Sequence, residues 1–384
     1  GDHRDLHSFP TRRSSDLNRF VFENAAVFDG YIQGGPAGSV NILDYSAYAT
    51  AIEVDLTDMD VPASDNTLKP GSATGVMGVN NIQQVIGGGS SSDILVGQGQ
   101  DNEWVVSGAN SGTLNGSIGF SGFETLVGQD DYADAFTIMA GGSVDGALMG
   151  SVGDAAQGLD AIKIDAGGSS TTISYLVAGV DSGAVTRDGD VLHYSGIEWV
   201  ADNSTAQTRN FNYLGDASVT VSFSGLLSEG QTWGVLVDGV EYAHTVSGAE
   251  SLTDVVADLA DRIGAAGRYL TNALGSTLIV SGLSSTTPEI AKVRADKTST
   301  VPTSAVVAIE EPTAKDTGIR IGRDDATGML DLYSLNATFG YFQIADPTIL
   351  NVSAGSGDDA FSVGAFTTAA SLRLDGEGGT DSIV

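Results

Sequence analysis

The sequence predicts a mainly-β protein: a β-solenoid or β-helix-like stack of short strands, interrupted by a small α+β domain. Three observations lead to this prediction. Short apolar runs are separated by Gly, Ser, Asn and Asp turns, the chain contains an internal repeat, and convincing helical periodicity is confined to one segment. With 384 residues, the chain is long enough for two or three domains.

The two ends of the sequence predict a fragment. Residues 1–17, GDHRDLHSFPTRRSSDL, resemble the translation of a short sequencing adapter, so we treat them as an artefact and exclude them from the fold. The chain stops at Val384, within a strand-like apolar run. We therefore expect native segments beyond both ends, and the missing start leaves the export route open.

The first region, residues 18–204, carries the repeat. Residues 20–44 align with residues 136–160 without a gap, 116 positions apart. The matched pairs are Phe20 with Phe136, Asp29 with Asp145, Gly30 with Gly146, Ile32 with Leu148, Gly34 with Gly150, Leu43 with Leu159 and Asp44 with Asp160. Internal repetition is typical of solenoids, in which each coil buries apolar side chains against its neighbours.

Shorter motifs recur in the same region. Residues 82–87 resemble residues 123–128, and the run at 120–124 reappears at 194–198. Apolar residues alternate with polar ones in each copy, as half-buried strands require. We interpret these aromatic and aliphatic positions as stacked core residues rather than as a ligand-binding platform.

The second region, residues 205–308, has the pattern of an α+β insert of the β-β-α-β type. Alternating strands precede a helix whose apolar residues fall on one face, from Leu252 to Ile263. Ser251 is the expected N-cap, with Asp254 in the first turn. This pattern resembles modules inserted in flagellar hook and filament-associated proteins and in repetitive adhesins. The short-strand texture returns in residues 309–384, which we predict to be a second β repeat region.

Charge and composition exclude several classes of partner and site. The formal net charge is −32, and the chain has no cysteine. An acidic chain repels nucleic acid and anionic membrane surfaces, and it attracts divalent cations. Without cysteine there can be no disulfide and no thiolate metal site. No apolar run approaches the roughly 20 residues that span a bilayer.

Three Gly-Asp loops could bind calcium. Residues 354–361 resemble the hemolysin-type calcium nonapeptide, and poorer matches lie at residues 376–383 and 88–95. Glycines permit the turn, while aspartates supply hard oxygen ligands, of which calcium takes about 6–8. The candidate calcium-site residues are Asp358, Asp359, Asp381 and Asp93, with the turn glycines Gly355 and Gly357.

The alternative is that these loops are only sharp corners between strands, since Gly and Asp favour turns for conformational reasons. Asp359 and Asp381 are 22 positions apart, whereas tandem nonapeptides repeat every nine. Both interpretations remain open at this stage.

The sequence predicts no enzyme. His193 and His244 are isolated, and we find no nucleophile elbow, phosphate loop or His-rich metal motif. The overall texture resembles giant bacterial adhesins and hemolysin-type calcium-binding repeat proteins. That resemblance implies a non-catalytic role in spacing or adhesion, at the surface of a Gram-negative-type bacterium or outside it. It also implies a glycan or protein receptor on a host or matrix, with calcium as the cofactor. The alternatives are a fragment of a β-helix carbohydrate-active enzyme and a flagellar or phage-tail-like structural component.

Overall fold

The fold was analysed in a computed structural model. It describes residues 17–35, 38–62, 68–150, 158–165, 172–177, 179, 181–187, 189–213, 218–224, 227–238, 240–248, 250–264, 269–274, 276–282, 290–296, 306–310, 318–324, 326–335, 339–345, 347–355, 358–364, 371–376 and 379–384. The predicted mainly-β, repeat-like architecture is confirmed: many short strands form a few sheets, and the described residues contain one helix.

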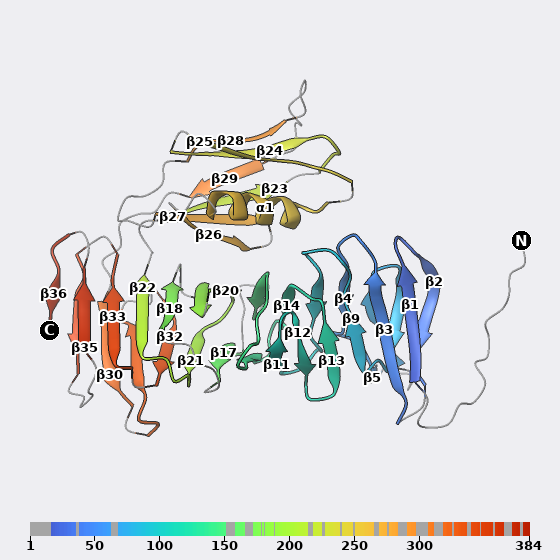
Figure 1. The fold of residues 1–384 in the computed structure, drawn as a ribbon, viewed down its shortest axis with the longest axis horizontal. Helices are drawn as coiled ribbons and strands as arrows, with labels where there is room; N and C mark the ends of the chain where they lie inside the picture. Colours follow the sequence, from blue (N-terminus) through green and yellow to red (C-terminus); the bar gives the residue numbers. More distant parts are fainter. Residues whose placement is uncertain are drawn as a thin grey trace, which may run out of the picture.

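Two long sheets form the body of the molecule (Figure 1). The 14-stranded sheet runs in the order β1 (Leu17–Glu23), β3 (Val40–Ala47), β9 (Gln84–Ile86), β13 (Ile118–Ser121), β12 (Ser111–Leu114), β11 (Glu103–Gly108), β15 (Ala135–Ile138), β17 (Ala161–Ile164), β21 (Trp199–Asp202), β32 (Tyr341–Ile344), β31 (Leu330–Ser334), β30 (Gly318–Arg323), β34 (Ala360–Val363) and β36 (Ser382–Ile383). Its alternating strands, such as the run Phe136-Thr137-Ile138, place one face inward and the other outward.

The 13-stranded sheet lies opposite. Its order is β2 (Phe28–Gln33), β8 (Val76–Asn80), β7 (Gly71–Ala73), β4 (Glu53–Asp55), β10 (Ile94–Val96), β14 (Thr125–Val127), β16 (Ala147–Met149), β20 (Asp190–Ser195), β19 (Gly183–Arg187), β18 (Thr172–Val177), β22 (Thr208–Tyr213), β33 (Ile349–Ser353) and β35 (Ser371–Asp375). A separate two-stranded ribbon joins β5 (Val61–Pro62) to β6 (Leu68–Lys69).

The chain winds between the two sheets, so most neighbouring strands are parallel. Along one stretch of the 14-stranded sheet, Phe136 pairs with Ile162, and Ile162 pairs with Val200. Four antiparallel excursions widen the stack: β4 with β7 and β8, β11–β13, β18–β20 and β30–β32. The resulting body is an elongated β-solenoid with β1 and β2 at one end and β35 and β36 at the other (Figure 1).

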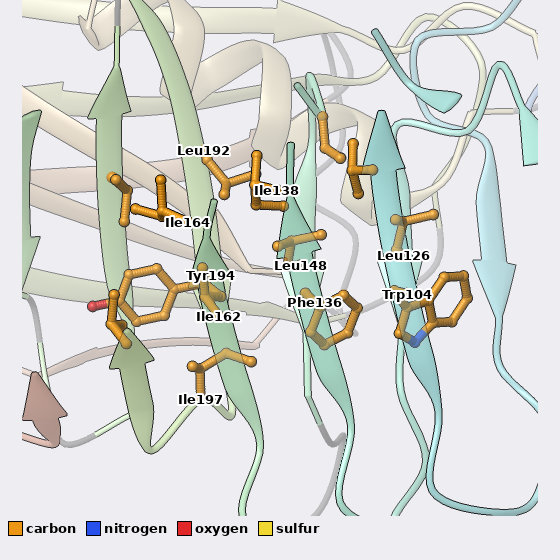
Figure 2. Packing of buried hydrophobic residues seen from close by; sticks show 14 of the residues in the cluster. Trp104, Leu126, Phe136, Ile138, Leu148, Ile162, Ile164, Leu192, Tyr194 and Ile197 are labelled. Atoms are coloured by element: carbon orange, nitrogen blue, oxygen red, sulfur yellow. The ribbon is translucent and has the colours of Figure 1, made fainter. Parts of the chain in front are cut away.

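Apolar side chains fill the space between the two sheets. Trp104 and Phe136 stack with ring centroids 5.7 Å apart and planes 10° apart. Figure 2 shows the same line of side chains continuing through Ile162, Leu148 and neighbouring residues. The aromatic and aliphatic positions of the short motifs belong to this core, as expected: Ile82, Phe120, Phe123, Tyr194 and Ile197. Burial of these side chains is the main stabilising contribution to the stack.

The long repeat corresponds to about one coil. Phe20 and Phe136 both lie in the 14-stranded sheet, while Ile32 and Leu148 are both buried in the 13-stranded sheet. The equivalence then lapses, because Leu43 is fully buried and Leu159 is 71% exposed. The gapless alignment therefore extends beyond the structural equivalence, since coils of unequal loop length shift out of phase.

The insert occupies residues 218–310 and packs its own core beside the solenoid (Figure 1). One sheet has the order β26 (Tyr269–Leu274), β27 (Thr277–Gly282), β23 (Ser218–Ser224) and β29 (Val306–Glu310); the other has β25 (Val240–Thr245), β24 (Thr232–Val237) and β28 (Ile290–Asp296). Three strands precede the helix and four follow it, so the topology is larger than the predicted β-β-α-β unit.

The helix α1 (Leu252–Gly264) closes the core of the insert. Its predicted apolar face is buried, through Val255, Val256, Leu259, Ala260 and Ile263. Ser251 caps it as expected: the Asp254 N–H donates to Ser251 Oγ at 3.2 Å, and the Ser251 N–H donates to Asp254 Oδ2 at 2.7 Å.

The boundary predicted at residue 205 falls before a strand of the solenoid. β22 pairs in parallel with β18 and with β33, placing Phe211 beside Tyr175 and Val352. The solenoid closes directly across the insert, because β21 likewise pairs with β32. Strands of both bodies alternate apolar and polar residues, so the sequence pattern could not separate them.

Candidate functional site

The most regular polar feature of the solenoid lies at its corners, where the chain enters a strand. A carboxyl or amide side chain there accepts a hydrogen bond from a backbone N–H of the neighbouring coil. We call the set of acceptors the corner ladder, which comprises Gln83, Asp93, Glu124, Asp134, Asp160, Glu198 and Asp381.

Each hydrogen bond from a backbone N–H to an acceptor of the ladder is called a rung. Three consecutive rungs lie along the 14-stranded sheet. The Asn102 N–H donates to Asp134 Oδ1 at 2.9 Å, and the Asp134 N–H donates to Asp160 Oδ1 at 2.7 Å. The Asp160 N–H donates in turn to Glu198 Oε2 at 2.8 Å. Each residue precedes its strand directly, so each bond fixes the register of one coil on the next.

The other rungs repeat this geometry. Beside the 13-stranded sheet, the Ile52 N–H donates to Asp93 Oδ1 and the Asp93 N–H to Glu124 Oε2, both at 3.0 Å. The Asn41 N–H donates to Gln83 Oε1 at 3.0 Å, and the Asp359 N–H donates to Asp381 Oδ1 at 3.1 Å. Hydrogen bonds from backbone N–H groups to corner side chains thus occur near both ends of the solenoid.

In two rungs, the second carboxylate oxygen of the aspartate accepts a hydrogen bond from the loop that leads into its own strand. Asp93 Oδ2 accepts from the Gly88 N–H, and Asp134 Oδ2 accepts from the Gln129 N–H at 2.6 Å. A glycine lies just before each donor because the loop turns against the next coil. A Cβ at Gly87 would lie 1.7 Å from the Gly122 carbonyl oxygen. Glycine and aspartate therefore recur together for a structural reason.

The rungs that use Glu or Gln have a different corner. A residue with positive φ comes first, followed by a buried apolar residue and the acceptor; φ is +72° at Gly122, +62° at Gly196 and +53° at Asn81. The recurring motifs of the sequence are these corners. Their aromatic residues enter the core, and Glu124, Glu198 and Gln83 complete the rungs.

Burial alters the electrostatics of the ladder. Desolvation raises the pKa of Asp160 to about 7, although the Asp134 N–H lowers it, and the nearby charges of Asp134 and Glu198 raise it further. Desolvation likewise raises the pKa of Glu124 to about 7, with Asp93 as the main like-charged neighbour. The pKa values of Asp93, Asp134 and Glu198 are also raised, first of all by burial. The charged ladder is therefore kept at an electrostatic cost.

The predicted calcium residues belong to these corners. Asp358 Oδ1 accepts from the Thr380 N–H at 2.7 Å, next to the rung of Asp359 and Asp381. The structure brings these three residues together before β34 and β36 of the 14-stranded sheet, whereas Asp93 precedes β10 of the 13-stranded sheet. Gly355 has φ +86°, as a turn glycine requires. Gly357 lies outside the described residues.

Calcium would compete with the backbone for the same oxygens. Asp93, Asp358 and Asp381 each accept a backbone N–H, so binding a cation through those oxygens would require the loops to rearrange. Within the described part of the chain, no three His, Asp or Glu side chains are arranged to hold a metal ion. Calcium binding stays a prediction.

Sequence reasoning did not predict that Glu124, Asp134, Asp160 and Glu198 accept backbone hydrogen bonds. The available signal was an acidic residue directly before a short apolar strand, as in DAFTI at 134–138 and DAIKI at 160–164. That pattern predicts a corner acceptor because the N–H directly before the neighbouring strand needs a partner.

A second buried network lies between β21 and β22, the last two strands of the solenoid before the insert. Arg209 and Asp202 are both fully buried, with Arg209 Nε donating to Asp202 Oδ2 at 2.9 Å. Tyr175 donates its hydroxyl to the same carboxylate oxygen, and the Ser204 N–H donates to Asp202 Oδ1 at 2.7 Å. This network fixes the corner between β21 and β22.

His193 is buried, and desolvation lowers its pKa to about 4. One small, mainly apolar cavity is lined by Ile138, Val144, Ile164, Val185 and Leu192, together with Arg187 and Asp190. Arg187 donates to the carbonyl oxygens of Met139 and Gly142, at 3.0 and 2.7 Å, which is a structural role.

No helix in the described ranges is long and apolar enough to cross a membrane. Comparison with protein-family models, with curated proteins and with solved structures finds no match. The function must therefore be argued from the fold and its residues.

Proposed function

We propose that this chain is a non-catalytic structural or adhesive segment of a large secreted or cell-surface bacterial protein. The observation that carries the proposal is the continuous stack of 14 and 13 strands, whose polar side chains serve the register of the coils. Such a body provides length and stiffness. Solenoids use these properties for extended binding surfaces and for spacing.

The insert is the part of the chain better suited to specific recognition. It has its own core and leaves the solenoid pairing intact, because β21 and β22 meet β32 and β33 directly. A domain carried in this way can vary without disturbing the rod. We propose a glycan or a protein of a host or matrix as its partner.

The acidic charge favours this setting. A net charge of −32 keeps long sheet edges soluble and discourages pairing between copies. It also disfavours nucleic acid as a partner. Calcium would reduce the repulsion between carboxylates, and it remains part of the proposal as an accessory cation.

Binding, turnover and assembly assays distinguish the candidate functions. The purified chain is applied to glycan and matrix-protein arrays, together with the chain whose insert is replaced by a short Gly-Ser linker. Insert-dependent binding supports adhesion, and absence of binding with a persistent rod shape supports spacing. Release of reducing sugar from polysaccharides would indicate the carbohydrate-active enzyme. Concentration-dependent filaments would indicate the flagellar or phage-tail-like component.

A further inference from the structure

His244 of the insert lies between two carboxylates from different segments. Its Nε2 is 2.8 Å from Glu250 Oε2, in the loop after β25. Its Nδ1 is 2.8 Å from Asp258 Oδ2, in the middle of α1. The His244 side chain is 14% exposed, so both contacts are partly shielded from water.

Only the charged imidazole satisfies both carboxylates. An imidazolium donates from both ring nitrogens, whereas neutral histidine has one donor and one lone pair. After loss of the proton, one carboxylate would therefore face a lone pair and repel it. The pKa of His244 is accordingly raised, with burial opposing the effect of the two carboxylates.

The surroundings reinforce this geometry. The Ser247 hydroxyl donates to Glu250 Oε1 at 2.7 Å, which holds the loop carboxylate in place. Arg262 donates to Asp258 Oδ2 from the next turn of α1. These contacts lower the pKa of Glu250 and of Asp258, although burial opposes both shifts. The two acids therefore remain charged while the imidazole titrates.

The neighbouring elements supply few other charges. β24 places Trp233 opposite His244 in the antiparallel pair, and Tyr242 lies two positions along β25. In α1, Asp254 is engaged with Ser251. The strands β23, β26 and β27, which also pack against the helix, contain no charged residue. β28 carries Lys292, Arg294 and Asp296, and it lies on the other side of β24 from β25.

We propose that His244, Glu250 and Asp258 form a proton-dependent clamp that holds α1 against β25 while the imidazole is charged and loosens when it is neutral. Since the folded-state pKa of His244 is raised, its contribution is complete below the unfolded value of about 6.5 and is lost as pH rises through the folded value. The acids titrate below their ordinary range, so the clamp is strongest in mildly acidic solution.

Proton NMR of the histidine rings and amide hydrogen exchange of α1, measured on the full chain between pH 5 and pH 9, test the clamp. The signal that disappears in His244→Gln identifies the residue, and it is expected to titrate above 6.5. Glu250→Gln and Asp258→Asn should each lower that midpoint. Between pH 6 and pH 8.5, protection in α1 should fall about tenfold for each unit by which the midpoint exceeds 6.5.

The matched control is exchange in the same helix of His244→Gln, corrected for the intrinsic pH dependence. We expect it to lack the extra loss of protection. The proposal is overturned if His244 titrates at or below 6.5, or if α1 loses protection equally in the wild-type chain and in His244→Gln. Since His193 titrates near 4, it does not interfere in this window.

Discussion

At the scale of single residues, the solenoid depends on side chains that serve the backbone. A buried N–H without a partner costs roughly 1–3 kcal/mol, so an acceptor at each corner has a measurable effect on stability. Asp134 shows this most clearly, because its two oxygens accept from the Asn102 and Gln129 N–H groups. Burial of the charge partly offsets the gain, as its raised pKa indicates.

Replacing Asp134 with Ala should therefore destabilise the solenoid by about 1–3 kcal/mol, because two backbone donors lose their acceptor. Denaturant unfolding followed by circular dichroism measures the change. Asp29→Ala is the matched control, because Asp29 is exposed in β2 and this substitution also removes one carboxylate. Equal effects of the two substitutions would contradict the structural role of the ladder.

Arg209 is expected to be the most sensitive cation of the solenoid. Arg209→Met leaves the buried charge of Asp202 without its ion-pair partner, and breaking a buried pair on one side costs about 3–5 kcal/mol. Arg19→Met is the comparison, because the Arg19 side chain is 52% exposed although it also binds a buried aspartate. Thermal unfolding should show a large loss for the first variant and a small one for the second.

The raised carboxyl pKa values predict that acid stabilises the solenoid. Asp160 and Glu124 titrate near 7 when folded and near 4 when unfolded, so their protonation favours the fold. This stabilisation is complete below about pH 4 and is lost as pH rises through 7. The melting temperature should therefore rise from pH 8 to pH 5.5, in 0.5 M salt to screen the net charge.

Glu198→Gln isolates the contribution of the ladder to this pH dependence. It retains an acceptor for the Asp160 N–H, as Gln83 does natively for Asn41, but it removes a charge that raises the pKa of Asp160. We expect a smaller rise in melting temperature between pH 8 and pH 5.5. Glu53→Gln removes an exposed charge and should leave the slope unchanged.

At the scale of elements, the sequence indicated the secondary structure well and its boundaries less well. The apolar face of α1 and its Ser251 cap could be predicted because helical periodicity and capping are local. The assignment of β22 could not, because its alternating pattern suits either body and only pairing with β18 and β33 decides. Register is a long-range property of a parallel sheet.

In the candidate site, too, local features could be predicted from the sequence and long-range contacts could not. The Gly-Asp loops were visible as turns with a carboxylate, but the group that the carboxylate would bind was not. Asp93 accepts the Ile52 N–H from a residue 41 positions earlier, a contact that only the coil geometry brings together. The acid-before-strand pattern at Asp134 and Asp160 was local and could have been recognised as a corner signal.

The pairing across the insert predicts that the solenoid folds without it. A chain in which a short Gly-Ser linker replaces residues 214–317 retains the pairing of β21 with β32 and of β22 with β33. Circular dichroism should remain strand-rich, and unfolding should remain cooperative. Loss of cooperative unfolding would mean that the insert is required for the solenoid.

At the scale of the whole molecule, the solenoid is a rod whose coils are held by apolar stacking and by carboxylates bonded to backbone N–H groups. The insert is carried beside this rod, with its own core and the clamp at His244 (Figure 1). An acidic rod of this type is consistent with the proposed place in a large surface protein. We infer that the corners of the rod hold without a metal ion, because their carboxylates bind backbone N–H groups.

Thermal unfolding of the full chain in chelator and in calcium, with Asp134→Ala in parallel, tests that claim most directly. We expect the chain to be strand-rich and to unfold cooperatively in chelator. We also expect a lower melting temperature for Asp134→Ala in both solutions. A chain that is unfolded in chelator and folds only when calcium is added would contradict it. The Gly-Asp corners would then be metal sites first, as the calcium interpretation of their sequence holds.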